Sequence, residues 1–106
     1  MISSKKFASL ACVTIIAFTS AALAVTDSEI EPAISQSDDY LTHKSAFIVA
    51  ARSLLESRRC TIAELKEMGG FVKSQSYKNR PIYFTYCGGM TIKNRIMLDV
   101  STGRIF

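Results

Sequence analysis

The residues whose side chains could carry out chemistry are few in this sequence. There is one histidine, His43, and there are three cysteines, of which Cys60 and Cys87 lie 27 residues apart. A cysteine and a histidine can act as a nucleophile and its base, but that role needs a thiolate. A zinc site needs three or four closely spaced ligands, which two distant cysteines and one histidine do not provide. We therefore expect no catalytic role for His43, no metal and no cofactor.

The acid of the C-terminal part and the glycine pairs also match no catalytic motif. Asp99 is the only acid in the strand-rich C-terminal part, and a retaining glycosidase would need a second carboxylate opposite it. We expect Asp99 to face solvent or to pair with an arginine such as Arg104. The glycine pairs at 69–70 and 88–89 match neither a Walker loop nor a dinucleotide-binding loop. They are better explained as a helix end and a hairpin turn.

Bases and aromatic residues alternate through the C-terminal part of the chain. On one face of a sheet they could stack bases or sugars and neutralise phosphates, or they could form a protein interface. The alternative is an ordinary solvated surface, because side chains alternate along a strand and a small sheet must bury one of its faces. The candidate binding face consists of Lys73, Tyr77, Lys78, Arg80, Tyr83, Lys93 and Arg95.

The first 24 residues are typical of an export signal. Lys5 and Lys6 precede twelve uncharged, mostly apolar residues, 7–18, and the small-x-small sequence Ala22-Leu23-Ala24 follows. We expect cleavage after Ala24, with Val25 as the first residue of the exported protein. An uncleaved anchor and a lipoprotein are the alternatives. The ending is typical of bacterial signals, so we expect a periplasmic or secreted bacterial protein.

Export changes what the cysteines and the charges imply. A secreted chain that retains two cysteines most simply forms one disulfide, here Cys60–Cys87. Residues 25–39 contain five acids and no base, and we expect them to form a flexible acidic arm. Residues 40–106 contain 11 bases and four acids and should form a single small domain. This asymmetry could mean an anionic partner or an acidic arm that lies on its own basic domain. An ordinary solvated surface is the third explanation.

Helical patterns precede strand patterns in that domain. Apolar residues at helical spacing predict a long helix over 41–57, with Ser37, Asp38 and Asp39 as candidate N-caps. Thr61 and Glu64 fit a capping box and predict a second, short helix. Strand-like runs follow at 71–74, 81–87 and 95–100, with an extended end at 104–106. The sequence therefore predicts an α+β fold, in which one long and one short helix pack on a small antiparallel sheet of about three strands.

These features favour a small exported binding protein without enzymatic activity. Its expected partner is another protein in the bacterial envelope or outside the cell, as for an inhibitor, an immunity protein or an accessory subunit. A basic-surface module that binds an anionic polymer or a membrane surface is the first alternative. A small secreted enzyme or toxin is the second, and it would require a cleft with perturbed acids.

Overall fold

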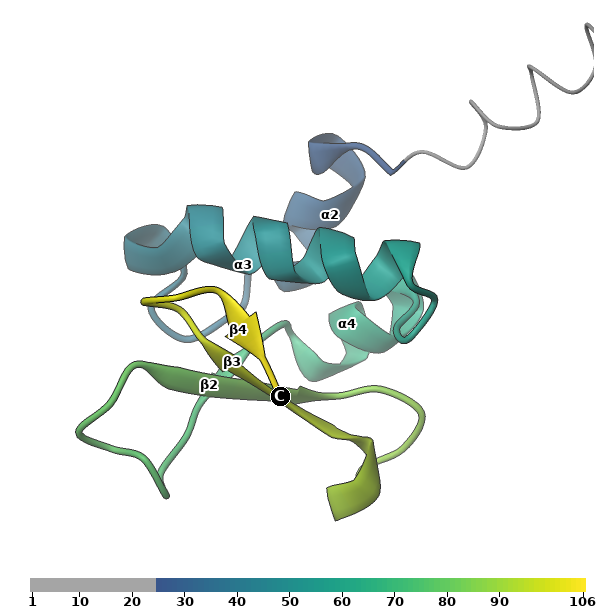
Figure 1. Cartoon of the computed structure of the whole chain (residues 1–106). Helices are drawn as coiled ribbons and strands as arrows, with labels where there is room; N and C mark the ends of the chain where they lie inside the picture. Colours follow the sequence, from purple (N-terminus) through teal and green to yellow (C-terminus); the bar gives the residue numbers. More distant parts are fainter. Residues whose placement is uncertain (1–24) are drawn as a thin grey trace, which may run out of the picture.

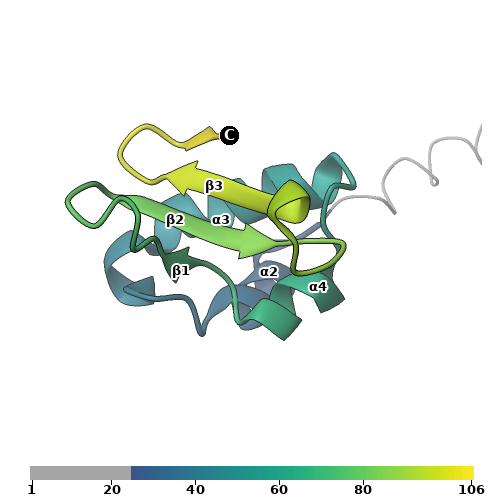
Figure 2. The same cartoon turned by 90° about the horizontal axis from the view of Figure 1, so that it is seen from below.

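A computed structural model describes residues 25–106, so the expected export signal lies outside the described residues. The chain forms a layer of helices against one face of a sheet, as Figures 1 and 2 show. The strands pair antiparallel in the order β1-β2-β3-β4. This confirms the predicted α+β class, with a fourth strand and one more α-helix than the sequence predicted. In chain order the elements are α2 (Asp27–Ile34), α3 (Tyr40–Glu56), α4 (Ile62–Met68), β1 (Val72–Lys73), β2 (Ile82–Tyr86), η1 (Ile92–Asn94), β3 (Arg95–Asp99) and β4 (Arg104–Ile105).

The two predicted helices form for the local reasons that their sequences indicate. Helix α3 buries a stripe that includes Phe47, Ala51 and Leu54. The capping box begins α4, because the Glu64 amide donates to the Thr61 hydroxyl over 3.1 Å and the Thr61 amide donates to the Glu64 carboxylate over 2.9 Å. Helix α4 ends at Gly69, whose φ of 76° is left-handed and is readily adopted only by glycine.

Residues 25–39 correct the expectation of a flexible acidic arm. Residues 27–34 form α2, which packs against α3 and α4 and fully buries Ile30 and Ile34. Two acids of this segment also bind α3, since Lys44 forms an ion pair with Glu31 over 2.9 Å and Arg52 pairs with Asp27. The apolar residues of α2 recur at helical spacing, and their burial outweighs the polar composition of the segment. The folded part of the chain therefore includes α2.

The connection between α2 and α3, residues 37–39, joins the helix layer to the sheet. The Ser37 hydroxyl donates to the Ile34 carbonyl over 2.6 Å and accepts from the Phe71 amide over 2.8 Å. Asp38 accepts from the Lys73 amide over 2.8 Å, and its own amide donates to the Phe71 carbonyl over 2.9 Å. Gly70 leaves room for this contact, because a Cβ there would lie 2.1 Å from the Ser37 hydroxyl oxygen.

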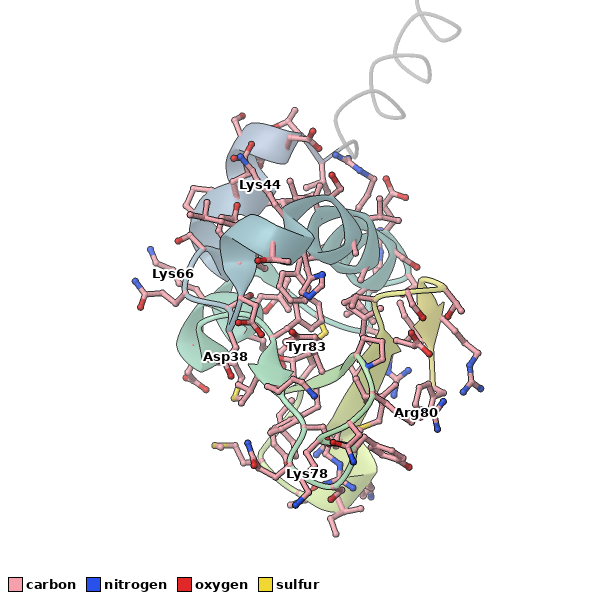
Figure 3. All side chains as sticks on the ribbon, turned by 90° about the vertical axis from the view of Figure 1, so that its left-hand side faces the viewer. Asp38, Lys44, Lys66, Lys78, Arg80 and Tyr83 are labelled. Atoms are coloured by element: carbon pink, nitrogen blue, oxygen red, sulfur yellow. A yellow bond between two sulfur atoms is a disulfide. The ribbon has the colours of Figure 1, made fainter. Side chains whose placement is uncertain are left out.

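Asp39 stands at the N-cap position of α3 but does not cap the helix, which corrects the expected role of the two aspartates. Its φ of 54° and ψ of 36° are left-handed, and its side chain makes no hydrogen bond to the first turn of the helix. The carboxylate accepts instead from the Tyr83 hydroxyl on β2 over 2.6 Å. Figure 3 shows Asp38 and Tyr83 close together where the two layers meet. Both aspartates therefore bind the sheet.

A second link, which is covalent, joins the layers beyond the other end of β2. The predicted disulfide between Cys60 and Cys87 is confirmed, with the two Cα atoms 5.3 Å apart. Cys60 lies between α3 and α4, and Cys87 directly follows β2. Both residues are buried in the core between the layers. The strand β2 is thus held to the helices near both of its ends.

Replacing both cysteines with serine should lower the free energy of unfolding by about 3.5 kcal/mol, because the chain-entropy model gives this value for a closed loop of this length. Urea denaturation of residues 25–106 measures the change. Wild-type protein under reducing conditions is the matched control and should show a similar loss. An unchanged urea midpoint in either sample would contradict a stabilising role for this disulfide.

Candidate functional site

The histidine and cysteine side chains that could carry out chemistry serve structural roles in the described part of the chain. The imidazole ring of His43 packs edge-on against two aromatic rings, with centroids 5.9 Å from Phe47 and 5.4 Å from Tyr83. The thiols of Cys60 and Cys87 are joined in the disulfide, so neither supplies a thiolate to His43. Within residues 25–106, no three histidine, cysteine or acidic side chains gather in a way that could hold a metal ion.

Asp99 closes a turn and is not solvent-facing. Arg104 lies opposite Asp99 in the pairing of β3 with β4, but the two side chains make no ion pair, so both expectations for Asp99 are corrected. Its side chain accepts from the Ser101 amide over 2.9 Å and from the Ser101 hydroxyl over 2.6 Å. Only 7% of the residue is exposed. The hydrogen bond from the Ser101 hydroxyl is the main factor that lowers the pKa of the Asp99 carboxyl below its ordinary value. Asp99 therefore shapes the connection between β3 and β4.

Tyr83 lies in the core and must be removed from the candidate binding face. The residue is 2% exposed, and its ring meets that of Phe47 edge-on with centroids 5.2 Å apart. Burial, followed by the hydrogen bond to Asp39 and the charge of that carboxylate, raises the pKa of the Tyr83 hydroxyl above its ordinary value. The hydroxyl is therefore neutral at physiological pH and serves as a hydrogen-bond donor to Asp39.

The other six predicted residues do not form one patch. Lys73 is held within the fold, since its ammonium donates to the Arg80 carbonyl over 2.8 Å and approaches the Tyr83 ring to 5.6 Å. Tyr77, Lys78 and Arg80 are exposed in the connection that precedes β2, and Figure 3 shows Lys78 and Arg80 on the side away from the helices. Lys93 and Arg95 follow the opposite end of β2. The predicted surface thus splits into two basic clusters at the two ends of β2.

The space between these clusters is occupied by apolar side chains that the candidate list omitted. Val72 pairs with Phe84, Phe84 pairs with Met97, and Met97 exchanges two backbone hydrogen bonds of 2.9 Å with Phe106. Paired residues of an antiparallel sheet point to the same side, and Tyr83, the neighbour of Phe84, points to the helices. These four residues therefore form a row across the sheet on its outer face, the side away from the helices. Figure 2 views the molecule from this side.

Arginine and aromatic side chains flank this apolar row. Tyr86 meets Phe84 edge-on with centroids 5.6 Å apart and lies opposite Arg95. The guanidinium carbon of Arg104 lies 4.2 Å from the centre of the Phe106 ring. Phe84, Tyr86 and Met97 are partly exposed, and Phe106 is 40% exposed. The outer face is thus an apolar strip with basic margins that remains accessible to a partner.

The positive charge of the protein is concentrated in the sheet layer, residues 69–106. This layer contains six lysines and arginines and one acid, Asp99, whereas residues 25–68 contain eight acids and five bases. The formal charges are therefore +5 for the sheet layer and −3 for the helix layer. Both ion pairs in the described part of the chain, Lys44–Glu31 and Arg52–Asp27, lie in the helix layer. The bases of the sheet layer make no ion pair with a described carboxylate.

The alternation of side chains along β2 could have identified the apolar residues of the outer face that the candidate list omitted. Tyr83 and Phe84 point to opposite faces, so assigning Tyr83 to the core places Phe84 and its cross-strand neighbours outside. Sequence alternation divides a strand into two faces but does not say which one the helices cover. The register of β1 and the pairing of Phe106 depend on tertiary contacts, which the pattern of either segment alone does not specify.

Comparison of the chain with protein-family models, curated proteins and solved structures gave no match. No helix among residues 25–106 has the length and apolar character needed to cross a membrane.

Replacing Tyr83 with phenylalanine should destabilise the fold by about 1.5–3 kcal/mol near neutral pH, because a partly buried hydrogen bond to a carboxylate is lost while the ring stays in the core. Urea denaturation measures this loss. Tyr77→Phe is the control, since Tyr77 is exposed. It should leave the unfolding midpoint almost unchanged.

Tyr83→Phe also tests how the stability of the fold depends on alkaline pH. A raised pKa in the folded state makes the contribution of Tyr83 complete below about pH 10, where an unfolded tyrosine titrates, and progressively weaker above that pH. Tyr83→Phe lacks this titration, so its stability should fall less steeply than that of the wild type above that pH. Parallel stability curves for the two proteins would contradict the Tyr83–Asp39 bond.

Proposed function

We propose that this protein is an exported, non-enzymatic binding protein that acts on another protein through the outer face of its sheet. The observation that carries the proposal is the apolar row of Val72, Phe84, Met97 and Phe106. The row runs from β1 across β2 and β3 to the residue that follows β4, on the side that the helices leave uncovered. Contiguous apolar surface that remains exposed on a small domain is typical of an interaction site. An inhibitor, an immunity protein and an accessory subunit all act in this way.

The composition of the outer face supports a protein partner. Protein interfaces are enriched in tyrosine, phenylalanine, methionine and arginine, and they place apolar residues at the centre and polar residues at the rim. The outer face has this arrangement, since Phe84 and Met97 lie centrally while Arg95 and Arg104 lie at its margins. Antiparallel strands that are also tied to the helices present this surface with little flexibility, which lowers the entropic cost of binding.

Two features support action outside the cytoplasm. Residues 1–24 have the three parts of an export signal, and the disulfide between Cys60 and Cys87 would persist in an oxidising compartment. The exported chain would then be a small disulfide-linked protein in the periplasm or the medium of a bacterium.

A second candidate function is favoured by the charge distribution. The sheet layer has a charge of +5, and its bases make no ion pair with a carboxylate in the part of the chain that the structure describes. Both features would suit a module that binds an anionic polymer or a membrane surface. Such binding should weaken steeply with added salt, because it depends mainly on charge. Contact through the apolar row should survive high salt, so salt dependence distinguishes the two candidates.

Met97→Glu should abolish capture of a partner from a bacterial envelope or culture-fluid extract by residues 25–106. A charge in the middle of the apolar row would have to be desolvated in the complex, which we expect to weaken binding at least tenfold. The matched control is Val49→Glu, because Val49 is 66% exposed on α3 in the helix layer. The captured protein is identified by mass spectrometry after washes at low and high salt.

One protein that is retained at high salt by the wild type and by Val49→Glu, but lost with Met97→Glu, is the expected result. Equal capture by both variants would rule out the outer face as the binding surface. Capture of heterogeneous anionic material that washes away with salt would favour the second candidate function.

A further inference from the structure

The connection between β2 and β3, residues 88–94, exposes two large apolar side chains that no other described element covers. Met90 is 72% exposed and Ile92 is 77% exposed, and they flank Thr91 at the tip of the connection. Figure 1 shows η1, which includes Ile92, projecting from the sheet on the side away from the helices. The two residues lie beyond the end of β2, outside the apolar row that crosses the sheet.

Hydrogen bonds hold this connection in one shape, so the exposure of its apolar tip is built into the fold. The Asn94 side-chain amide donates to the Gly88 carbonyl over 3.2 Å and to the Thr91 hydroxyl over 3.0 Å. The Asn94 backbone accepts from the Cys87 amide over 3.2 Å, directly beside the disulfide. Gly89 has a φ of 130°, a conformation that other residues rarely adopt, and a Cβ there would lie 3.2 Å from the Asn94 side chain.

The charged residues nearest the tip in the sequence are all bases. Between Glu67 and Asp99 the chain contains no acid and five bases, two of which, Lys93 and Arg95, directly follow the tip. Lys93 is exposed and Arg95 is partly exposed, and neither makes an ion pair with a described carboxylate. A projecting apolar tip with bases behind it matches the layers of an anionic bilayer, where acyl chains lie beneath negatively charged headgroups. A convex tip of this kind also needs no preformed pocket in its partner.

We infer that the 88–94 connection docks on an anionic phospholipid bilayer, with Met90 and Ile92 in the headgroup–acyl boundary and Lys93 and Arg95 against the phosphates. The inference develops the second candidate function and does not depend on protein binding by the outer face. Each base near an anionic surface strengthens binding only about fivefold. Two bases and two apolar side chains should therefore give weak, reversible attachment.

A single tryptophan tests this inference directly, because the chain contains no natural tryptophan. Ile92→Trp places the reporter at the tip, and Val49→Trp places it at an equally accessible apolar position on α3. Each variant of residues 25–106, with its disulfide intact, is mixed with vesicles of phosphatidylcholine alone or with roughly 30% phosphatidylglycerol. The readouts are the shift of tryptophan emission and its quenching by brominated acyl chains.

The expected result is a blue shift and quenching for Ile92→Trp only on vesicles that contain phosphatidylglycerol, with no change for Val49→Trp. In co-sedimentation, Lys93→Glu should weaken binding more than fivefold, and Ile92→Ser about tenfold. Lys66→Glu, an exposed charge reversal on α4, should leave binding unchanged.

Several results would overturn the inference. Equal quenching on both kinds of vesicle, no quenching on either, or the same response from Val49→Trp would each exclude a specific contact by this connection. If the protein does not bind vesicles but still captures a partner in a way that depends on Met97, the bilayer contact is overturned and the protein-binding proposal stands. Charge-dependent binding to double-stranded DNA without binding to vesicles would assign the basic residues to an anionic polymer instead.

Discussion

Three consecutive residues between α2 and α3, Ser37 to Asp39, hydrogen-bond to β1, to β2 and to Phe71, which directly precedes β1. They thereby hold the helices against one face of the sheet. Each such bond contributes about 1 kcal/mol net, which matters in a domain whose total stability is about 5–15 kcal/mol. The contacts also require Gly70, because any side chain there would displace the Ser37 hydroxyl. With the disulfide beyond the other end of β2, they determine which face of the sheet is covered.

The uncovered face and the distribution of charge follow from this arrangement. Once Tyr83 points to the helices, its strand neighbour Phe84 must point outward, and register brings Val72, Met97 and Phe106 into line with it. Two acids of α2, Asp27 and Glu31, pair with bases of α3, whereas the bases of the sheet layer make no ion pair with any carboxylate of residues 25–106. One layer therefore serves as a mildly acidic support, and the other presents apolar and basic side chains together.

Sequence patterns predicted the elements whose signals are local. They failed where contacts between distant segments determine whether an element forms or which of its faces is buried. The helix at 40–56, the Thr61 capping box, the strands β2 and β3 and the disulfide all follow from spacing or from residue type. Helix α2 was wrongly predicted to be a flexible arm, although Thr26 and Glu29 form a capping box before Ile30 and Ile34. Its stability comes from burial against α3 and α4, which composition does not reveal. Tyr83 was wrongly placed on a binding face because alternation alone does not identify the buried side.

The central claim, that the outer face of the sheet is the surface that binds a partner, can be tested without knowing the partner. Residues 25–106 contain three methionines, of which Met97 lies in the apolar row and Met68 lies on α4. Oxidation of accessible methionines, measured by mass spectrometry, compares the purified protein with the protein in its envelope or culture-fluid extract. The structure predicts that the extract lowers oxidation of Met97 and leaves Met68 unchanged. Protection of Met68 with full oxidation of Met97 would contradict the claim and place the interface on the helices.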